Sequence, residues 1–105
     1  MLNSVLSVLT SRTALVLLES PTNPLIKIID IPSITRLTRE ISPGAIVAVD
    51  NTMLSPYLQR PLEMGVDIVY ESATKYLGGH HDIMAGVIGV NDLALGEVGP
   101  VIFRY

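Results

Sequence analysis

The stretch Ser72-Ala73-Thr74-Lys75-Tyr76-Leu77-Gly78-Gly79-His80 places one lysine directly behind two hydroxyl residues and ahead of a glycine pair. A strand-like segment at residues 67–71 leads into it. A second strand-like segment, at residues 46–49, ends at Asp50. Parallel strands of an α/β sheet carry functional groups at their carboxyl ends. We therefore expect this stretch and Asp50 to lie at the same edge of a buried sheet.

The rest of the chain fits such a sheet. Apolar runs predict four strands, at residues 13–19, 46–49, 67–71 and 84–90. Asp30 is placed as a helix N-cap, Pro32 fits the first helical turn, and residues 31–41 repeat apolar side chains at helical spacing. This order predicts the α/β class, with a mostly parallel sheet and crossover helices.

The remaining segments are predicted as follows. Residues 1–12 are interpreted as the end of a helix rather than as a transit peptide. Residues 26–29 are expected to be extended, residues 51–57 to form a loop, and residues 62–64 to form a short helix between Pro61 and Gly65. Arg36, Arg39 and Glu40 are expected to face water.

The composition is unusually apolar for a chain of 105 residues. Charged residues make up 16% and hydrophobic residues 49%, whereas about 25% charged residues is typical. One interpretation is a compact domain whose parallel sheet is covered on both faces, so that its strands are wholly apolar. The other is a piece of a larger oligomer whose further parts cover apolar faces, and this second interpretation is favoured.

Charge and cysteine usage exclude several classes of function. The net charge of −3 and the scattered basic residues do not indicate a nucleic-acid-binding protein. The absence of cysteine excludes disulfides, thiolate zinc sites and thiol nucleophiles, and it fits a reducing, cytoplasmic location. No apolar run approaches the roughly 18 residues of a membrane-spanning helix, so no membrane partner is predicted.

Five polar residues at the ends of strands form a candidate cofactor site. They are Asn23, Asp50, Ser72, Thr74 and Lys75. A lysine amine can form a Schiff base with pyridoxal 5'-phosphate (PLP), hydroxyls can bind its phosphate, and a carboxylate can keep its ring nitrogen protonated. The alternatives are a solvated lysine, hydroxyls that cap a turn, and turn-forming roles for Asp50 and Asn23. Spacing alone leaves these open.

Two further expectations concern the loops of this site. The neighbours Ala73, Tyr76 and Leu77 suggest that the Lys75 amine is partly buried, which would make it a usable nucleophile. The proline-rich loop suggests a cis Asn23-Pro24 bond.

The run His80-His81-Asp82 has residue types that bind metals, but adjacent histidines in an extended segment point opposite ways. A loop that packs beside the lysine is therefore preferred, with no metal.

Several motifs in order then resemble those of a known family. They are Glu19-Ser20-Pro21-Thr22-Asn23-Pro24, Val49-Asp50-Asn51-Thr52, Ser55-Pro56-Tyr57, Arg60-Pro61-Leu62-Glu63-Met64-Gly65, Ser72-Ala73-Thr74-Lys75-Tyr76 and Gly79-His80. Together they resemble the Cys/Met-metabolism, or trans-sulfuration, PLP-dependent enzymes over residues 13–92. The run from His80 to Gly86 is most similar to the cystathionine β-lyases of that family.

The resemblance implies a site and an activity. It implies part of the large domain of the type I PLP-dependent transferases, with the Schiff-base role at Lys75 and the ring-nitrogen contact at Asp50. Phosphate contacts fall on Ser72 and Thr74, and a contact to the cofactor oxygen or the substrate carboxylate falls on Asn23. The implied reaction is β-elimination from cystathionine, a small amino-acid substrate, to homocysteine, pyruvate and ammonia, in a homo-oligomer.

Other outcomes stay open on the sequence alone. Cystathionine γ-lyase or γ-synthase chemistry would use the same residues. Members of the family are several times longer, so we expect a partial-length copy, with residues 1–92 belonging to the PLP-binding large domain and residues 93–105 forming a divergent tail. A non-catalytic remnant is the third alternative, and the isolated chain is expected to be inactive.

Overall fold

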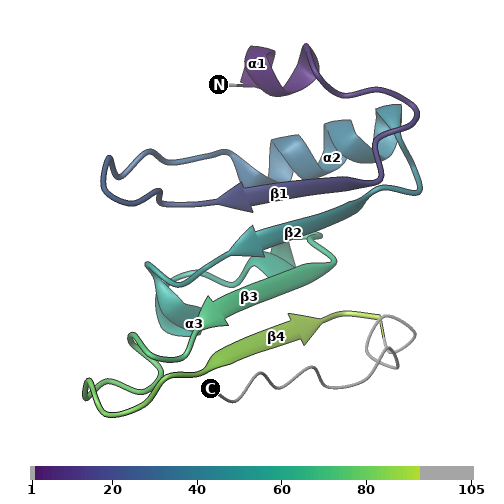
Figure 1. The fold of residues 1–105 in the computed structure, drawn as a ribbon. Helices are drawn as coiled ribbons and strands as arrows, with labels where there is room; N and C mark the ends of the chain where they lie inside the picture. Colours follow the sequence, from purple (N-terminus) through teal and green to yellow (C-terminus); the bar gives the residue numbers. More distant parts are fainter. Residues whose placement is uncertain (1, 93–105) are drawn as a thin grey trace.

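The computed structural model describes residues 2–92, which build one four-stranded sheet with helices packed against it (Figure 1). In chain order the elements are α1 (Leu2–Leu6), β1 (Leu15–Glu19), α2 (Ile31–Ile41), β2 (Ile46–Asp50), α3 (Ser55–Leu58), the 3-10 helix η1 (Pro61–Met64), β3 (Ile68–Ser72) and β4 (Gly86–Val90). The four predicted strands are all present, with small shifts at their ends. The α/β class with a mostly parallel sheet is confirmed, whereas the predicted tail at residues 93–105 lies outside the described residues.

The strands follow one another across the sheet in chain order, β1-β2-β3-β4 (Figure 1). β1, β2 and β3 are parallel, and β4 runs antiparallel to β3. β4 reverses direction because the connection from β3 closes on itself, with the Thr74 amide donating to the Ala85 carbonyl at 3.2 Å. No helix crosses over between these two strands. The three parallel strands therefore end at one edge, where β4 begins.

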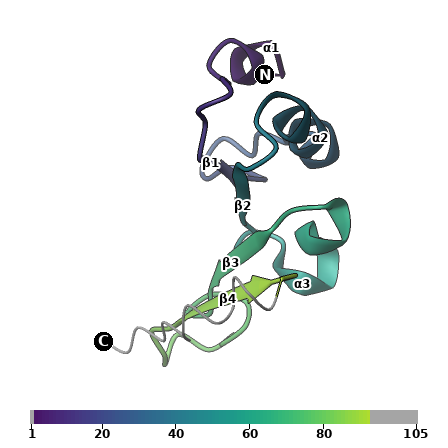
Figure 2. The same ribbon diagram turned by 90° about the vertical axis from the view of Figure 1, so that its right-hand side faces the viewer.

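The core lies on one face of the sheet. Figure 2 shows α2, α3 and η1 on that face, and the buried apolar side chains come from the strands and helices that meet there. They are Val16, Leu18, Ile31, Ile34, Val47, Val49 and Val66. No helix among residues 2–92 is long and apolar enough to cross a membrane.

The other face of β1 is open to solvent within the described part of the chain. Burial alternates along β1, so that Leu15 and Leu17 are 55% and 60% exposed while Val16 and Leu18 are buried. The less favoured interpretation, a compact domain with strands covered on both faces, therefore does not hold for β1 within the described residues. An apolar run cannot distinguish a strand covered on two faces from one covered on a single face.

Helix α2 begins as its sequence predicts. The Asp30 side chain accepts a hydrogen bond from the Ser33 amide at 3.0 Å and one from the Ser33 hydroxyl at 2.8 Å. Pro32 occupies the first turn, where a missing N–H group costs no hydrogen bond. The bond from the Ser33 amide is the main reason that the pKa of Asp30 is lowered from its ordinary value of 3.8.

We expect stability to depend on the charge of Asp30 at low pH. Because the pKa of Asp30 is lower in the folded state than in the unfolded state, its contribution is present above about pH 4 and is lost as the pH falls through the folded pKa. Asp30→Ala should lower the melting temperature at pH 7, since the cap is lost. Asp30→Asn keeps a capping oxygen but does not titrate, so its melting temperature at pH 7 should stay close to that of the wild type. Thermal melts from pH 7 to pH 2.5 measure both effects, and a wild-type pH profile identical to that of Asp30→Asn would contradict the assignment.

Two loop predictions are wrong. Residues 26–29 form no strand, and Ile26 is not extended: it has φ +51°, and its amide donates to the Thr22 carbonyl while the Lys27 amide donates to the Thr22 hydroxyl, which closes a turn. The predicted loop at 51–57 contains α3, because the Asn51 carbonyl accepts the amides of Leu54 and Ser55 and so starts a helical turn. Both corrections come from local hydrogen bonds that a hydropathy pattern does not show.

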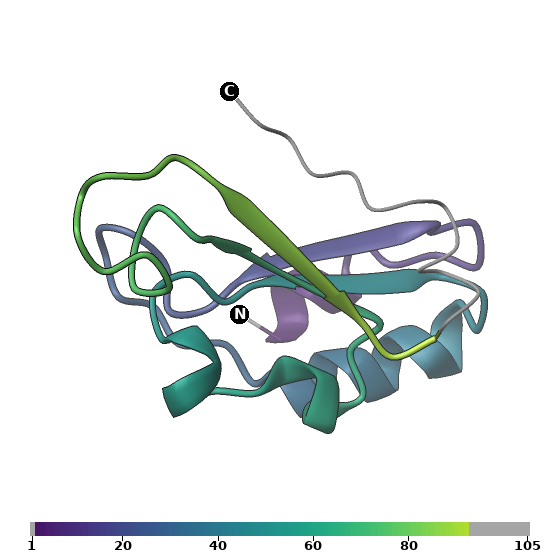
Figure 3. The same ribbon diagram turned by 90° about the horizontal axis from the view of Figure 1, so that it is seen from below.

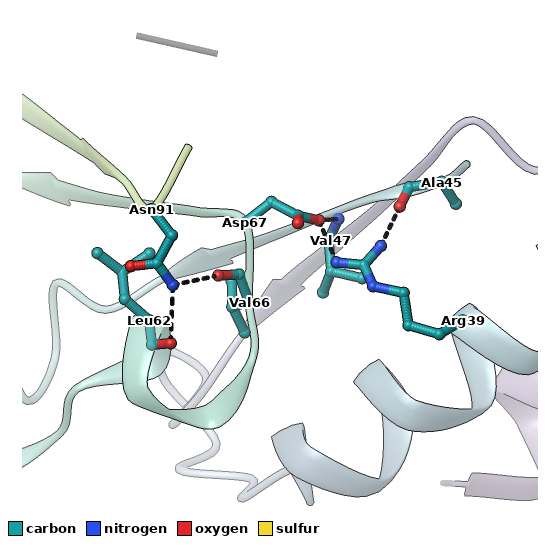
Figure 4. A network of polar contacts seen from close by, with 7 residues as sticks. All are labelled: Arg39, Ala45, Val47, Leu62, Val66, Asp67 and Asn91. Carbon is teal, nitrogen blue, oxygen red and sulfur yellow. Dashed lines mark hydrogen bonds and ion pairs between the residues drawn. The ribbon is translucent and has the colours of Figure 1, made fainter. Parts of the chain in front are cut away.

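Arg39 does not simply face water. Its guanidinium donates to the Ala45 carbonyl and to Asp67 Oδ2, the latter at 2.6 Å, and the same oxygen accepts the Val47 amide at 2.7 Å (Figure 4). Asn91 Nδ2 contacts the carbonyl oxygens of Leu62 and Val66 nearby. This network ties α2, β2 and the start of β3 together at the edge of the sheet opposite the candidate site.

Candidate active site at the carboxyl edge of the sheet

The predicted site residues lie where the parallel strands end. Glu19 pairs in register with Asp50, and Asp50 with Tyr70. Figure 3 shows the segments that follow β1, β2 and β3 meeting at this end of the sheet. Because all three strands run the same way, residues distant in sequence become neighbours here.

Two adjoining hollows hold the predicted residues. One, of about 430 Å³, is lined by Asn23, Thr74 and Lys75, with Glu19, Thr52 and His80 among the others. The second, of about 380 Å³, is lined by Asp50, Ser72 and Thr74, with Tyr70 and Thr52 beside them. Thr52 and Thr74 border both hollows. The structure thus brings Lys75 together with Asn23, and Asp50 together with Ser72, and Thr74 lies between the two groups.

Lys75 is exposed, which corrects the expectation of a partly buried amine. Its neighbours Tyr76 and Leu77 are 67% and 45% exposed, so they do not cover the amine. The backbone around it is nevertheless held: the Lys75 amide donates to the Ser72 carbonyl, and the Gly79 amide donates to the Lys75 carbonyl at 2.8 Å. Gly79 has φ +72°, a conformation that favours glycine.

The hydroxyl residues have structural partners as well as pocket positions. Thr74 Oγ1 accepts the Ala85 amide at 3.0 Å and contacts the Ala85 carbonyl at 3.4 Å. The second contact is long, so it leaves the hydroxyl proton available to a better acceptor. The Ser72 amide donates to Thr52 Oγ1 at 2.8 Å. Thr52 therefore joins the loop after β2 to the start of the Ser72–Lys75 turn.

Asp50 has two neighbours at the site. Its Oδ1 accepts the Thr52 backbone amide at 2.9 Å, and Tyr70, its partner in register on the adjacent strand, lines the same hollow. Burial, together with the negative charge of Asp50, raises the pKa of the Tyr70 phenol above its ordinary value of 10.0. The phenol is therefore neutral at pH 7, beside the Asp50 carboxylate.

This arrangement predicts a loss of stability in alkali. The raised pKa of Tyr70 favours the neutral phenol in the folded state, so its contribution is intact below about pH 10 and declines as the pH rises through the folded pKa. Urea unfolding at pH 8 to 11 should show this decline in the wild type. The decline should be smaller in Tyr70→Phe. Asp50→Asn should bring the phenol pKa, followed by phenolate absorbance, closer to 10, and an unchanged titration in that variant would contradict the assigned contact.

The loop that carries Asn23 is closed tightly at the pocket. The Asn23 amide donates to Glu19 Oε1 at 3.3 Å, and the Thr22 amide donates to the Lys27 carbonyl. The Asn23-Pro24 bond is cis, as the sequence suggested, and Ser20-Pro21 is also cis, which the sequence did not suggest. The Asn23 residue itself is exposed beside the pocket.

The chain is similar in sequence to known proteins over most of its length. The family profile of the Cys/Met metabolism PLP-dependent enzymes matches residues 1–100. This chain belongs to that family. It is 65% identical to a cystathionine β-lyase of Neurospora crassa over 94 residues, which is 90% of this chain and 21% of that protein. It is 54% identical to a cystathionine γ-synthase/O-acetylhomoserine (thiol)-lyase of Bacillus subtilis over 91 residues, which is 87% of this chain and 24% of that protein.

Solved structures support the same assignment. The fold matches cystathionine γ-lyase from Lactobacillus plantarum complexed with L-serine, with a TM-score of 0.86 and 44% identity, over 92% of this chain and 25% of that one. The fold of the Cys/Met-metabolism PLP-dependent enzymes is thereby confirmed. The chain spans about a fifth to a quarter of the length of these relatives.

The donor set at the carboxyl edge fits PLP, the cofactor of the family. An amine at Lys75 suits an aldehyde, the hydroxyls of Ser72 and Thr74 suit a phosphate, and the carboxylate of Asp50 suits a ring nitrogen. These are the groups that line the two adjoining hollows.

Two further site residues were not predicted from the sequence. Glu19 lines the Lys75 pocket and holds the Asn23 amide, and Thr52 borders both hollows and binds both Asp50 and Ser72. Glu19 could have been found because it ends β1 in register with Asp50. Thr52 carried no such signal, since a threonine two residues beyond a strand reads as an ordinary turn residue.

The adjacent histidines lie beside the lysine. His80 and His81 both line the Lys75 pocket, and His80 Nδ1 is 3.1 Å from the Gly78 carbonyl oxygen. Within residues 2–92, no three histidine, aspartate or glutamate side chains gather closely enough to hold a metal ion. The interpretation of this segment as a loop packed beside Lys75 agrees with its place in the structure.

Proposed function

We propose that this chain carries the cofactor-holding centre of a PLP-dependent carbon–sulfur lyase that acts on cystathionine. The observation that supports it most directly is the meeting of Lys75, Thr74 and Asn23 in one pocket, next to the hollow that contains Asp50 and Ser72. The proposed reaction is β-elimination, which yields homocysteine, pyruvate and ammonia. The similarity to the β-lyase of Neurospora crassa favours this direction.

Each residue has a proposed task. The Lys75 amine would hold the cofactor and, when free, would remove the proton from the substrate Cα. PLP, when bound, accepts the electron pair that this proton leaves behind. Asp50 keeps the ring nitrogen protonated through a charge-assisted hydrogen bond. Departure of the homocysteine thiolate from Cβ completes the elimination, and water then hydrolyses the remaining three-carbon enamine, as its imine, to pyruvate and ammonia.

The remaining residues hold and orient. Ser72 and Thr74 donate hydroxyl protons to the phosphate, and the long contact from Thr74 to Ala85 is the one that such a phosphate would replace. Asn23, in its closed loop, contacts the cofactor oxygen or the substrate carboxylate. Lys75 is exposed, so the same amine can reach an incoming substrate without a rearrangement of the turn that carries it.

A second candidate is γ-elimination or γ-replacement. The 54% identity to the Bacillus subtilis enzyme and the fold match to a γ-lyase favour it. It would use the same lysine, carboxylate and hydroxyls, so the residues of this site do not separate the two reactions. The products separate them: γ-elimination of cystathionine releases cysteine and 2-oxobutyrate, whereas β-elimination releases homocysteine and pyruvate.

The test is direct. The purified chain is titrated with PLP while the visible absorbance is followed, and L-cystathionine is then added while pyruvate, 2-oxobutyrate and thiols are measured. We expect a saturable band. Release of pyruvate and homocysteine in equal amounts would show that the chain catalyses the β reaction by itself, against the expectation from its partial length. Cysteine with 2-oxobutyrate would establish the γ reaction instead. Absence of both band and product would overturn the proposal for this chain and leave the non-catalytic alternative.

Partners and location are proposed on the family's precedent. We propose a small amino-acid substrate and a homo-oligomeric assembly, which size-exclusion chromatography with light scattering measures. A cytoplasmic location is proposed as well, because a chain with no cysteine among its 105 residues is suited to a reducing compartment.

A further inference from the structure

A buried polar network lies directly behind the candidate site. Asn51 is completely buried and Glu71 is 6% exposed. Asn51 Nδ2 donates to Glu71 Oε1 at 2.8 Å and to the Gln59 carbonyl at 2.9 Å, while Gln59 Nε2 donates to Asn51 Oδ1 and to the Ser20 carbonyl, each at 2.9 Å. The network therefore joins the ends of β1, β2 and β3. We call these three side chains, Asn51, Gln59 and Glu71, the amide clamp.

Each end of the clamp is one residue away from a proposed site residue. Asn51 follows Asp50, and Glu71 precedes Ser72. Asp50 and Ser72 line the 380 Å³ hollow of the site, and Glu71 also borders it. All three clamp residues line another hollow, of about 210 Å³, on the side of α3 and η1. This follows from the alternation of side chains along a strand. The two sets thus lie back to back on the same short pieces of backbone.

Hydrogen bonds of Asn51 and Thr52 connect the amide clamp to the site. The backbone amide of Asn51 donates to the Tyr70 carbonyl at 3.0 Å, and this bond fixes where the loop leaves β2. From there the Thr52 amide binds Asp50 Oδ1, and Thr52 Oγ1 binds the Ser72 amide. A displacement of Asn51 would therefore move Thr52, and Thr52 contacts both the carboxylate and the start of the Ser72–Lys75 turn.

We propose that Asn51, Gln59 and Glu71 are positioning residues that hold Asp50 and the Ser72–Lys75 turn in the geometry needed to bind the cofactor, an inference that rests on the proposed function. Burial of a carboxylate and two amides is costly unless they pair with one another, and a fully paired network rigidifies the backbone that carries it. Leucine or methionine in these positions would pack against the same helices but would not set the loop after β2.

The same strand offers a matched control. The Arg39–Asp67–Val47 network at the opposite edge also joins a carboxylate, a backbone amide and a long polar side chain (Figure 4). Asp67 directly precedes β3 and Ser72 ends it. Asp67→Asn therefore weakens a polar network of similar size at the other end of β3, far from the clamp.

The experiment compares Glu71→Leu, Glu71→Gln and Asp67→Asn by amide hydrogen exchange in the cofactor-free chain and by the dissociation constant for PLP. We expect Glu71→Leu to speed exchange at the Thr52 and Ser72 amides about tenfold or more and to weaken PLP binding by a similar factor, since a charged hydrogen-bond acceptor is lost. Glu71→Gln keeps an acceptor and should stay within about threefold of wild type. Asp67→Asn should speed exchange at the Val47 amide and leave Ser72 unchanged.

The outcomes separate this inference from the proposed function. Unchanged exchange at Thr52 and Ser72 in a folded Glu71→Leu chain would overturn the positioning role. If Glu71→Leu does not fold, Gln59→Met takes its place in the experiment. This substitution at a half-buried position removes two hydrogen bonds that the Gln59 side chain donates, and hydrogen exchange at the backbone amides of Thr52 and Ser72 measures its effect. If the wild type binds no PLP but Glu71→Leu still loosens Ser72, the cofactor proposal fails and the clamp stands.

Discussion

Lys75→Ala should abolish covalent attachment of PLP. Lys75 is the one residue proposed to bind the cofactor covalently. Reduction with borohydride should therefore label the wild-type chain with PLP and leave the variant unlabelled. The catalytic rate should fall by a factor of at least about 10³, because the same amine also moves the Cα proton. Mass spectrometry of the reduced chain measures the first effect and pyruvate release measures the second.

The sequence supplies its own control for this experiment. It contains two lysines, Lys27 and Lys75. Lys27 is exposed in the turn that Thr22 closes, and it is not among the residues that line the pocket. Lys27→Ala should keep the label, and proteolytic mapping should place it on Lys75. A label on Lys27, or one shared equally between the two lysines, would show reaction with surface amines rather than a site.

Ile34→Ala should strongly destabilise the fold. Ile34 is 1% exposed and packs in the cluster between α2 and the sheet. Truncation of a buried isoleucine to alanine costs about 2–5 kcal/mol through lost burial and the cavity that remains. That is a large share of a typical free energy of unfolding of about 5–15 kcal/mol. Urea unfolding followed by circular dichroism measures it.

Leu17→Ala is the matched variant on the opposite face. Leu17 lies on β1 between the buried Val16 and Leu18, but it is 60% exposed. Its truncation should change the free energy of unfolding by less than about 0.5 kcal/mol, as is usual at exposed positions. Equal losses in Ile34→Ala and Leu17→Ala would mean that the outer face of β1 is packed in solution.

Much of the fold could be predicted because its signals are local. Asp30 caps α2, Gly65 ends η1 in a left-handed conformation with φ +87°, and the strands follow their apolar runs. Residues 26–29 and 51–57 were predicted wrongly because the bonds from Thr22 and Asn51 that fold them are not visible in hydropathy. Arg39 was expected in water for a similar reason, since its partner Asp67 lies 28 positions away.

The site divides in the same way. The sequence alone indicated five site residues, because their residue types and their positions after predicted strands can be recognised in it. They are Lys75, Asp50, Ser72, Thr74 and Asn23. It did not reveal Glu19 and Thr52 as pocket residues, or the pairing of Asn51 with Glu71 across 20 positions. Those depend on which strands lie side by side and on which face each residue takes.

The sequence by itself therefore determined the chemistry that is available and the family to which the chain belongs, because residue types and motif order persist whatever the chain's shape. Only the tertiary structure decided that Lys75 is exposed, that the face of β1 bearing Leu15 and Leu17 is open, and that a buried amide clamp lies behind Asp50 and Ser72. The physical reason is that exposure and long-range hydrogen bonds depend on register and packing between strands. The sequence pattern shows which segments tend to form strands, but it does not show which strands lie next to one another or in which register.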